Sequence, residues 1–165
     1  MAVREIRLYG DPVLRSICSP VIDFGEKTEA LVQDLIETAK LPGRAGVAAP
    51  QIGISLQVFS FNVGGKVGYL INPENLVLKG KPELIDEGCL SVPGLWHQTL
   101  RYPEAELSGF QLDQSYITFS GEGLMAQALQ HEFDHLQGKV YLDRLSTEER
   151  KEAMKVLRQT DWFMR

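Results

Sequence analysis

Two of the three histidines in the chain fall within the segment Gln130-His131-Glu132-Phe133-Asp134-His135. It contains the pattern His-Glu-x-x-His on a predicted helix, where residues i and i+4 lie about 5–6 Å apart on one face. His131 and His135 can therefore bind one metal ion together. Glu132, on the neighbouring side of that face, can reach a water molecule at the ion without binding the metal. The pattern predicts a metal centre that activates water.

The surrounding helix helps to distinguish a metal site from a helix with two incidental histidines and a salt-bridged glutamate. Leu124, Ala128, His131 and His135 form one stripe along it. The histidines therefore continue an apolar face and do not point into open water. Ala128 precedes them where a simple core stripe would carry Leu or Val, which is typical of a pocket wall beside a metal.

A catalytic metal site needs a third protein ligand and one open position. The carboxylates available downstream lie on a helix with a solvated pattern: Glu148, Glu149 and Glu152. A better candidate is Cys89, which lies upstream in Glu87-Gly88-Cys89-Leu90-Ser91. A thiolate is a strong ligand for zinc or ferrous iron, and Gly88 lets other backbone approach closely. The other cysteine, Cys18, is interpreted as a small buried hydrophobic residue.

A third segment, Gly46-Val47-Ala48-Ala49-Pro50-Gln51-Ile52-Gly53, consists mostly of small residues against which other backbone can pack tightly. Gln51 supplies a polar amide near its end. This amide is either an ordinary turn residue or a fixed N–H donor for an oxygen that becomes negative during a reaction.

The composition excludes several classes of protein. The chain has 165 residues, 44% hydrophobic and 24% charged, so we expect one globular domain over residues 1–165. No stretch approaches the ~18 consecutive apolar residues of a membrane span, and we recognise no secretory leader. A formal net charge of −5 without a basic block argues against a nucleic-acid site. Two cysteines are too few for a disulfide scaffold and fit a reducing compartment.

The periodicity predicts a helical turn at 11–15 and helices at 28–40, 123–137 and 147–157, with Ser146 capping the last and Glu149 three residues on. The strand candidates are 57–62, 67–71, 76–78, 82–85, 98–101, 104–112 and 116–119. Gly64-Gly65 predicts a hairpin between the first two. Runs of strands with short turns, flanked by helices, favour an α+β fold with antiparallel pairing.

The three chemical segments, in this order, resemble the peptide deformylase family. Two family motifs are matched in full by Glu87–Ser91 and Gln130–His135. The first motif is matched by Gly46, Ala48, Ala49 and Gln51, although Arg44 stands where that motif begins with glycine. Asp11-Pro12-Val13-Leu14-Arg15 and Leu70-Ile71-Asn72-Pro73 are also similar to the family, so the resemblance covers roughly residues 9–145.

The resemblance implies antiparallel β-sheets packed around a central helix that carries the His-Glu-x-x-His motif, with a further C-terminal helix. It implies a hydrolase that removes the formyl group from the N-terminal formylmethionine of newly made proteins. One divalent ion, Fe²⁺ first, with Zn²⁺, Ni²⁺ or Co²⁺ as substitutes, would be held by Cys89, His131 and His135. Glu132 would carry the proton, while the Gln51 side chain and the Leu90 backbone N–H would stabilise the oxyanion.

The family positions imply a substrate pocket lined by Ala45, Gly46, Gly88, Leu124, Gln127 and Ala128. The substrate would be an N-formylmethionyl peptide or nascent chain, processed by a monomer in the bacterial cytoplasm, near the peptide exit of the ribosome. Many members carry arginine where this chain has Trp96, which we expect to form an aromatic rim with His97. We also expect Glu87 and Arg101 to pair behind the ligand loop.

Two other classes remain open from the residues. An endopeptidase of the His-Glu-x-x-His type would need a third ligand downstream, where no histidine follows His135. A closed structural zinc site would need four protein ligands, and Cys18 is the spare thiol. A catalytically inactive homologue would be expected to lack Glu132 or Gln51, and both are present.

Overall fold

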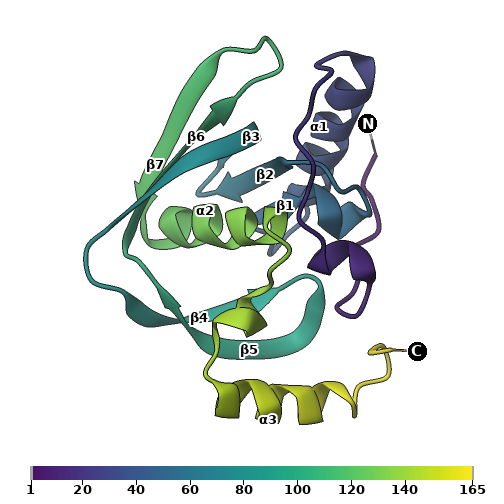
Figure 1. Cartoon of the computed structure of the whole chain (residues 1–165), viewed down its shortest axis with the longest axis vertical. Coiled ribbons are helices and arrows are strands. Elements are labelled where there is room, and N and C mark those ends of the chain that lie inside the picture. The colour runs from purple at the N-terminus through teal and green to yellow at the C-terminus, as the bar shows by residue number, and fades with distance from the viewer. Residues whose placement is uncertain (1, 165) are drawn as a thin grey trace.

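The structure, a computed structural model, describes residues 2–164 and has an α+β architecture (Figure 1). The α-helices are α1 (Glu26–Ala39), α2 (Gly123–Leu136) and α3 (Thr147–Leu157). The strands are β1 (Gly46–Ala48), β2 (Val58–Val63), β3 (Lys66–Lys79), β4 (Glu83–Cys89), β5 (Val92–Arg101), β6 (Glu104–Phe110) and β7 (Tyr116–Glu122). Short 3₁₀ helices span Pro12–Arg15, Ala49–Ile52 and Tyr141–Arg144. The predicted α+β class is confirmed.

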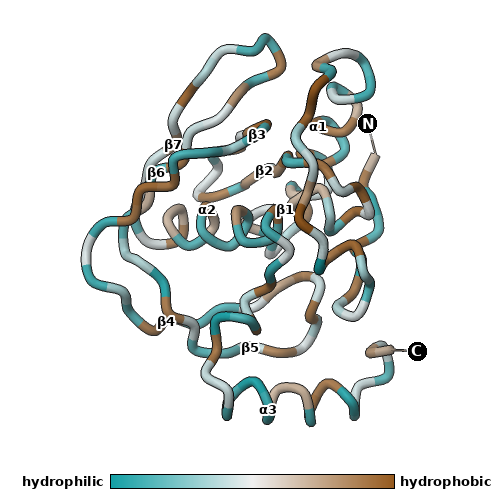
Figure 2. The backbone as a smooth tube through the Cα atoms, in the orientation of Figure 1, coloured by the Kyte–Doolittle hydropathy of each residue, from teal (hydrophilic) through white to brown (hydrophobic). Residues whose placement is uncertain are grey.

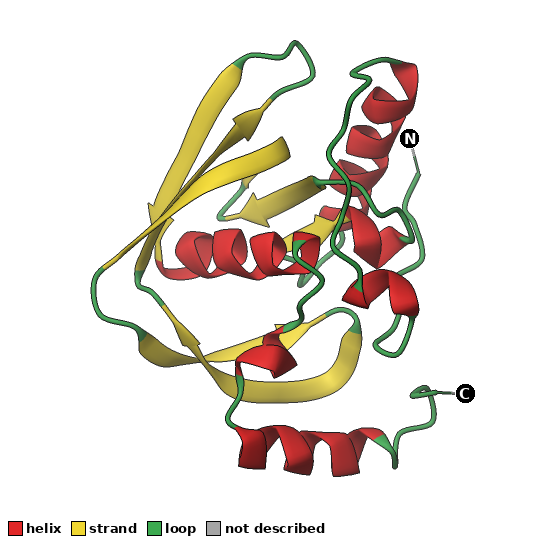
Figure 3. Ribbon diagram, in the orientation of Figure 1, coloured by secondary structure: helices red, strands yellow, loops and turns green. Residues whose placement is uncertain are grey.

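Five strands form one sheet in the order β1-β2-β3-β6-β7, and β4 and β5 form a separate hairpin (Figure 3). Every neighbouring pair is antiparallel. The turn between β2 and β3 is Gly64-Gly65, and both residues have positive φ, 58° and 82°. A two-residue turn of this kind matches the twist of the flanking strands, and the predicted hairpin is confirmed.

Strand β3 corrects one expectation, because the sequence predicted two separate strands at 67–71 and 76–78. Asn72 and Asn75 take left-handed φ values of 50° and 56°, and the pairing with β6 shifts register on both sides of Glu74. Asparagine tolerates this conformation because its short side chain can bond to nearby backbone. The Asn72 side chain also accepts the N–H of Val21 and donates to its C=O, which ties this point of the strand to a segment 51 residues away. The polar stretch is therefore a pair of bulges within one bent strand.

The five-stranded sheet is covered on both faces at β2, where residues 58–61 are all buried. Val58 packs in the cluster with α1, and the hydroxyl of Ser60 donates to the Leu35 carbonyl of that helix. Phe59 and Phe61 point the other way, into the cluster with α2. The polar side chain of Ser60 is tolerated in this buried strand because its hydroxyl is hydrogen-bonded.

Helix α2 lies between the five-stranded sheet and the β4–β5 hairpin, and α3 lies beyond that hairpin (Figure 1). Ala153 and Leu157 of α3 join the apolar cluster that includes Leu95 of β5. Hydrophobic and hydrophilic residues alternate along α3 (Figure 2). Ser146 caps α3 by accepting the backbone N–H of Glu149, as predicted. Within residues 2–164, no helix is both long and apolar enough to cross a membrane.

Candidate metal centre and active site

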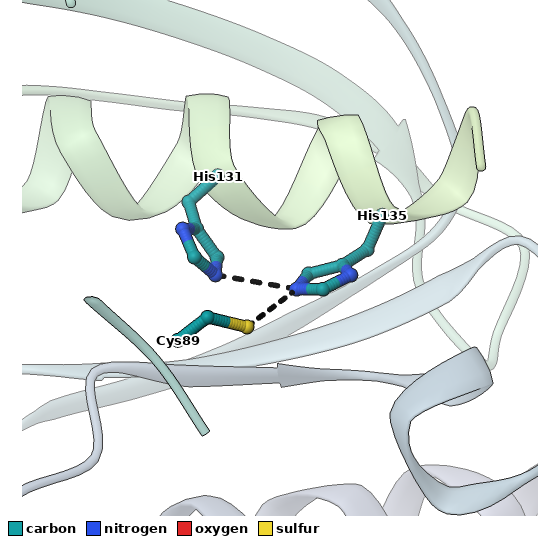
Figure 4. A group of neighbouring side chains, drawn as sticks. All are labelled: Cys89, His131 and His135. Atoms are coloured by element: carbon teal, nitrogen blue, oxygen red, sulfur yellow. Dashed lines mark hydrogen bonds between the residues drawn. The ribbon is translucent and has the colours of Figure 1, made fainter. Parts of the chain in front are cut away.

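One face of α2 descends from solvent into the interior and carries both histidines at its buried end. Leu124 in the first turn is 52% exposed, Ala128 is 4% exposed, and His135 in the last turn is fully buried. The predicted stripe is thus the wall of a depression. Cys89 ends β4 and faces the two imidazoles from the opposite side (Figure 4).

The three candidate ligand atoms converge on one point. His135 Nε2 lies 3.4 Å from Cys89 Sγ and 3.2 Å from His131 Nε2, and all three atoms lie within 4.8 Å of one another (Figure 4). Tetrahedral binding with Zn–N near 2.0–2.1 Å and Zn–S near 2.3 Å separates ligand atoms by about 3.3–3.6 Å. These donors therefore fit a divalent ion with three protein ligands and one open position.

The imidazoles present the correct nitrogens for this purpose. His131 Nδ1 lies 2.9 Å from a carboxylate oxygen of Glu87. A carboxylate only accepts, so Nδ1 carries a hydrogen and Nε2 is the nitrogen that faces the cluster. Without a metal, burial opposes protonation of His131, but Cys89 and Glu87 raise its pKa well above its ordinary value, so a bound cation would replace the proton on Nε2. Burial and the positive charge of His131 lower the pKa of His135 well below its ordinary value. The His135 imidazole is therefore neutral and can bind a metal.

Behind His131 lies a chain of buried charges. Arg101 forms a bidentate pair with Glu87, at 2.8 and 2.6 Å, so the predicted pair is confirmed. The same guanidinium donates to Asp134 at 2.8 Å, and Arg144 binds Asp134 from the other side at 2.6 Å. Burial would raise the pKa of Glu87, but hydrogen bonds from Arg101 and His131 lower it to about 2. Glu87 thus remains ionised and fixes the orientation of His131.

Glu132 lies in front of the cluster and is buried with one oxygen unengaged. Its Oε1 is 3.9 Å from His131 Nε2, while its Oε2 has no hydrogen-bond partner among the described residues. Burial raises the pKa of Glu132 to about 7, despite the opposing charge of His131. A carboxyl group poised near neutral pH can both accept and return a proton.

Gly46 leaves the space that Glu132 occupies. A Cβ at this position would lie 2.8 Å from the Ser60 carbonyl oxygen and 3.1 Å from Glu132 Cδ. Both distances are too short for an ordinary contact. The small-residue segment therefore packs β1 directly against the acidic side chain, as its composition suggested.

Gln51 has one orientation available to its amide. Its Oε1 accepts the backbone N–H of Ala48 at 3.0 Å, so its Nε2 must face the cluster. That nitrogen lies 3.6 Å from Cys89 Sγ and 3.2 Å from Ser91 Oγ. The side chain is therefore a fixed N–H donor beside the metal centre.

A cavity of about 590 Å³ opens in front of the cluster. Cys89, His131 and Glu132 line it, together with Gln51 and Leu90. Every residue predicted for substrate contact also lines it: Ala45, Gly46, Gly88, Leu124, Gln127 and Ala128. A larger hollow of about 680 Å³ lies between residues 4–11 and Trp162, but none of the three cluster residues borders it.

One expectation about side-chain direction changes. His97 does not join an aromatic rim, because adjacent residues of β5 point to opposite faces and its Nδ1 bonds the hydroxyl of Tyr141 at 3.0 Å. Gln127 donates to the Asp86 carbonyl at 2.9 Å, which braces α2 against β4.

Asp134 and Arg144 were not assigned roles from the sequence. Asp134 lies inside the histidine motif, whose spacing places it on the helix. Nothing local marks Arg144 as its partner.

The fold and the Cys-His-His group, which could hold a metal ion, are the arrangement expected of a metal-dependent hydrolase. A sequence model of the family described as polypeptide deformylase matches residues 3–151. The chain therefore belongs to the polypeptide deformylase family, and hydrolytic deformylation of peptides follows from this membership.

Individual relatives agree with this assignment. A peptide deformylase from Acidothermus cellulolyticus is 47% identical over 162 residues, which cover 98% of this chain and 89% of the relative. Peptide deformylase 1 from Corynebacterium glutamicum is 43% identical, with 99% of each chain covered. Among solved structures, a peptide deformylase from Legionella pneumophila superimposes with a TM-score of 0.86 at 35% identity, covering 93% of this chain and 92% of that one.

Proposed function

We propose that Cys89, His131 and His135 hold one divalent cation and that the chain removes formyl groups from N-formylmethionyl peptides at this centre. The observation that carries the proposal is the convergence of three ligand atoms beside a buried glutamate whose Oε2 is unengaged. Mixed thiolate and imidazole donors suit Fe²⁺, Zn²⁺, Ni²⁺ and Co²⁺. The family resemblance favours Fe²⁺ in the cell.

When bound, the cation supplies Lewis-acid chemistry, which lowers the pKa of a water molecule and stabilises negative charge on an oxygen. Glu132 Oε2 takes a proton from the water that attacks the formyl carbon. The Gln51 amide and the Leu90 backbone N–H donate to the formyl oxygen as it gains charge, and one such donor typically contributes about 2.7–4 kcal/mol. Glu132 then returns its proton to the leaving amine nitrogen, which releases formate and a free N-terminus.

The cavity walls support methionine as the first residue of the substrate. Leu124 and Ala128 lie one turn apart on α2, so an unbranched flexible side chain can lie against both. The floor near the cluster is closed by Gly46, which contacts Glu132 directly. We expect this floor to admit the hydrogen of a formyl group and to exclude the additional methyl group of an acetyl group.

The direct test is release of formate from formyl-Met-Ala-Ser by protein purified without oxygen, with bound metal measured alongside. We expect one metal ion per chain and rapid formate release. Formyl-Ala peptides of equal length should have a kcat/KM lower by about 10–200-fold, and acetyl-Met peptides should be poor substrates. Absence of formate from metal-loaded protein would contradict the proposal.

Two alternatives are less well supported. An endopeptidase is disfavoured because the third converging side chain is Cys89, upstream of the histidines; cleavage of internal peptide bonds without formate release would support it. A closed structural zinc site is disfavoured because no fourth His, Cys, Asp or Glu among the described residues belongs to the group.

We further propose that the whole chain acts as one catalytic domain and as a monomer. Its substrates, nascent formylmethionyl chains, arise at bacterial ribosomes, which favours action in the cytoplasm near the peptide exit. Gel filtration of the metal-loaded protein tests the monomer, and co-sedimentation with ribosomes carrying a nascent chain tests the location.

A further inference from the structure

Trp96 is a large apolar side chain held at the mouth of the catalytic cavity. It lines the cavity although 72% of its surface is exposed. Its six-membered ring lies against Gly88, where an added Cβ would come within 2.6 Å of Cε3 and 2.7 Å of Cζ3. Gly88 therefore permits this contact and fixes one side of the indole, while the rest faces the open cavity.

Other groups at the mouth are already engaged by the protein. Arg44 donates to the Thr38 carbonyl at 3.1 Å, and the carboxylate of Asp86 accepts a hydrogen bond from Gln98. Leu124 of α2 also lines the cavity and is 52% exposed. The mouth therefore offers an entering peptide a fixed aromatic ring and an aliphatic side chain.

We propose that Trp96 is a specificity-determining residue that favours formylmethionyl peptides with an aromatic or large apolar side chain at their second or third position. This inference rests on the proposed function, because it assumes that the formyl group lies at the Cys-His-His centre. An apolar side chain packed on the indole buries surface that is otherwise exposed to water, and a pre-positioned ring loses little conformational freedom on contact.

The placement of Trp96 selects those substrate positions. Gln51 and Ala128 line the inner part of the cavity and are 1% and 4% exposed, whereas Trp96 is 72% exposed, so the indole belongs to the outer part. An extended peptide advances about 3.3–3.6 Å per residue. With the formyl group at the cluster and methionine inside the cavity, the next one or two residues pass the indole.

The test compares kcat/KM for formyl-Met-Phe-Ser-Ser, formyl-Met-Ser-Phe-Ser and formyl-Met-Ser-Ser-Ser. We expect the wild type to prefer at least one phenylalanine peptide by about two- to tenfold. Trp96→Ala should reduce this ratio to near one, and Trp96→Phe should retain most of it. Leu100→Ala is the matched control, because Leu100 is also exposed on β5 at 50% but does not line the cavity; its ratio should equal that of the wild type.

A binding measurement keeps the inference testable apart from catalysis. The chain has two tryptophans, so Trp162→Phe leaves Trp96 as the sole indole fluorophore. In the zinc-loaded variant, at least one of unformylated Met-Phe-Ser-Ser and Met-Ser-Phe-Ser should shift the emission, and Met-Ser-Ser-Ser should shift it far less.

The outcomes separate the two proposals. Suppose that formate is released, but the wild type does not prefer phenylalanine peptides or Trp96→Ala leaves their kcat/KM ratio unchanged. That result overturns the role of Trp96 and leaves the proposed deformylation intact. No formate from any peptide overturns the proposed function. If no formate is released, the fluorescence measurement still tests Trp96. The role of Trp96 is overturned if all three peptides change the emission equally or if no peptide changes it, and it is supported if only phenylalanine peptides shift the emission.

Discussion

The two sides of His131 differ in how their buried polar groups are satisfied. Behind it, Glu87 is bonded by Arg101 and by His131 itself, and Asp134 is bonded by Arg101 and Arg144. In front, Glu132 Oε2 has no partner. His135 Nδ1, the ring nitrogen turned away from the cluster, also lacks one. Among residues 2–164, these are the buried side-chain oxygen and nitrogen atoms without a hydrogen bond.

This contrast separates the groups that hold His131 in position from the groups that take part in the reaction. A fully bonded network in a low-dielectric interior holds its members in one geometry, and so fixes the ring of His131. An unpaired carboxylate oxygen is costly to bury unless something else uses it. Glu132 lines the cavity in front of the cluster, where a water and a substrate would bind, so its unpaired oxygen is left free for the reaction. Four changes test this contrast.

Cys89→Ala should have the largest effect, since it removes one of three ligands from the front. We expect loss of stoichiometric metal and of nearly all deformylation. Cys18→Ala is the matched control, because Cys18 is buried in the apolar core away from the cluster. Metal analysis of both purified variants checks this, and full retention of metal by Cys89→Ala would contradict the ligand assignment.

Glu132→Gln should retain the metal but lose about 10²–10⁴-fold in kcat, because the amide keeps the size of the side chain but cannot accept the proton. Metal content and formate release are measured on the same preparation. A loss smaller than tenfold would mean that another group carries the proton.

Arg101→Met tests the ion-pair network behind His131. It leaves Glu87 and Asp134 buried with fewer partners, which typically costs about 3–5 kcal/mol and corresponds to a fall in Tm of roughly 10 °C for a chain this size. Arg144→Ala removes a partner that is 43% exposed, so we expect a clearly smaller shift. Calorimetry of both variants measures the two falls in Tm. Equal falls would show that the buried Arg101 stabilises the protein no more than the partly exposed Arg144 does.

The smallest effect is a pair of opposite pH dependences in metal-free protein. Burial raises the pKa of Glu132 to about 7, so the folded state binds the extra proton above the unfolded pKa, and stability falls as pH rises toward 7. The pKa of Glu87 is lowered to about 2, so its contribution is present above the unfolded pKa and is lost as pH falls toward 2.

Urea unfolding with a chelator measures both dependences. Relative to wild type, Glu132→Gln should gain stability between pH 4.5 and 8. Glu87→Gln should be destabilised at neutral pH, with the difference shrinking as the solution becomes strongly acidic. A Glu132→Gln difference that is constant over this range would show that Glu132 is not the group that titrates.

Most regular elements follow from local sequence. The three helices and the β2–β3 turn lie close to their expected positions, because periodicity, Ser146 and Gly64-Gly65 act over a few residues. Strand β3 departs, because its two asparagines also suit a turn. Only pairing with β6 and the contacts of Asn72 with Val21 make that stretch a bulged strand.

The sequence by itself determined the two histidines and the glutamate between them, because spacing along a helix fixes which side chains share a face. It also supplied Cys89 and Gln51 as candidates. The tertiary structure decided that Cys89 faces both imidazoles, that Gln51 turns its nitrogen toward the sulfur, and that Arg144 binds Asp134. These contacts join residues on separate elements, and their partners are chosen by packing and by the need to satisfy buried charges, which no local pattern encodes.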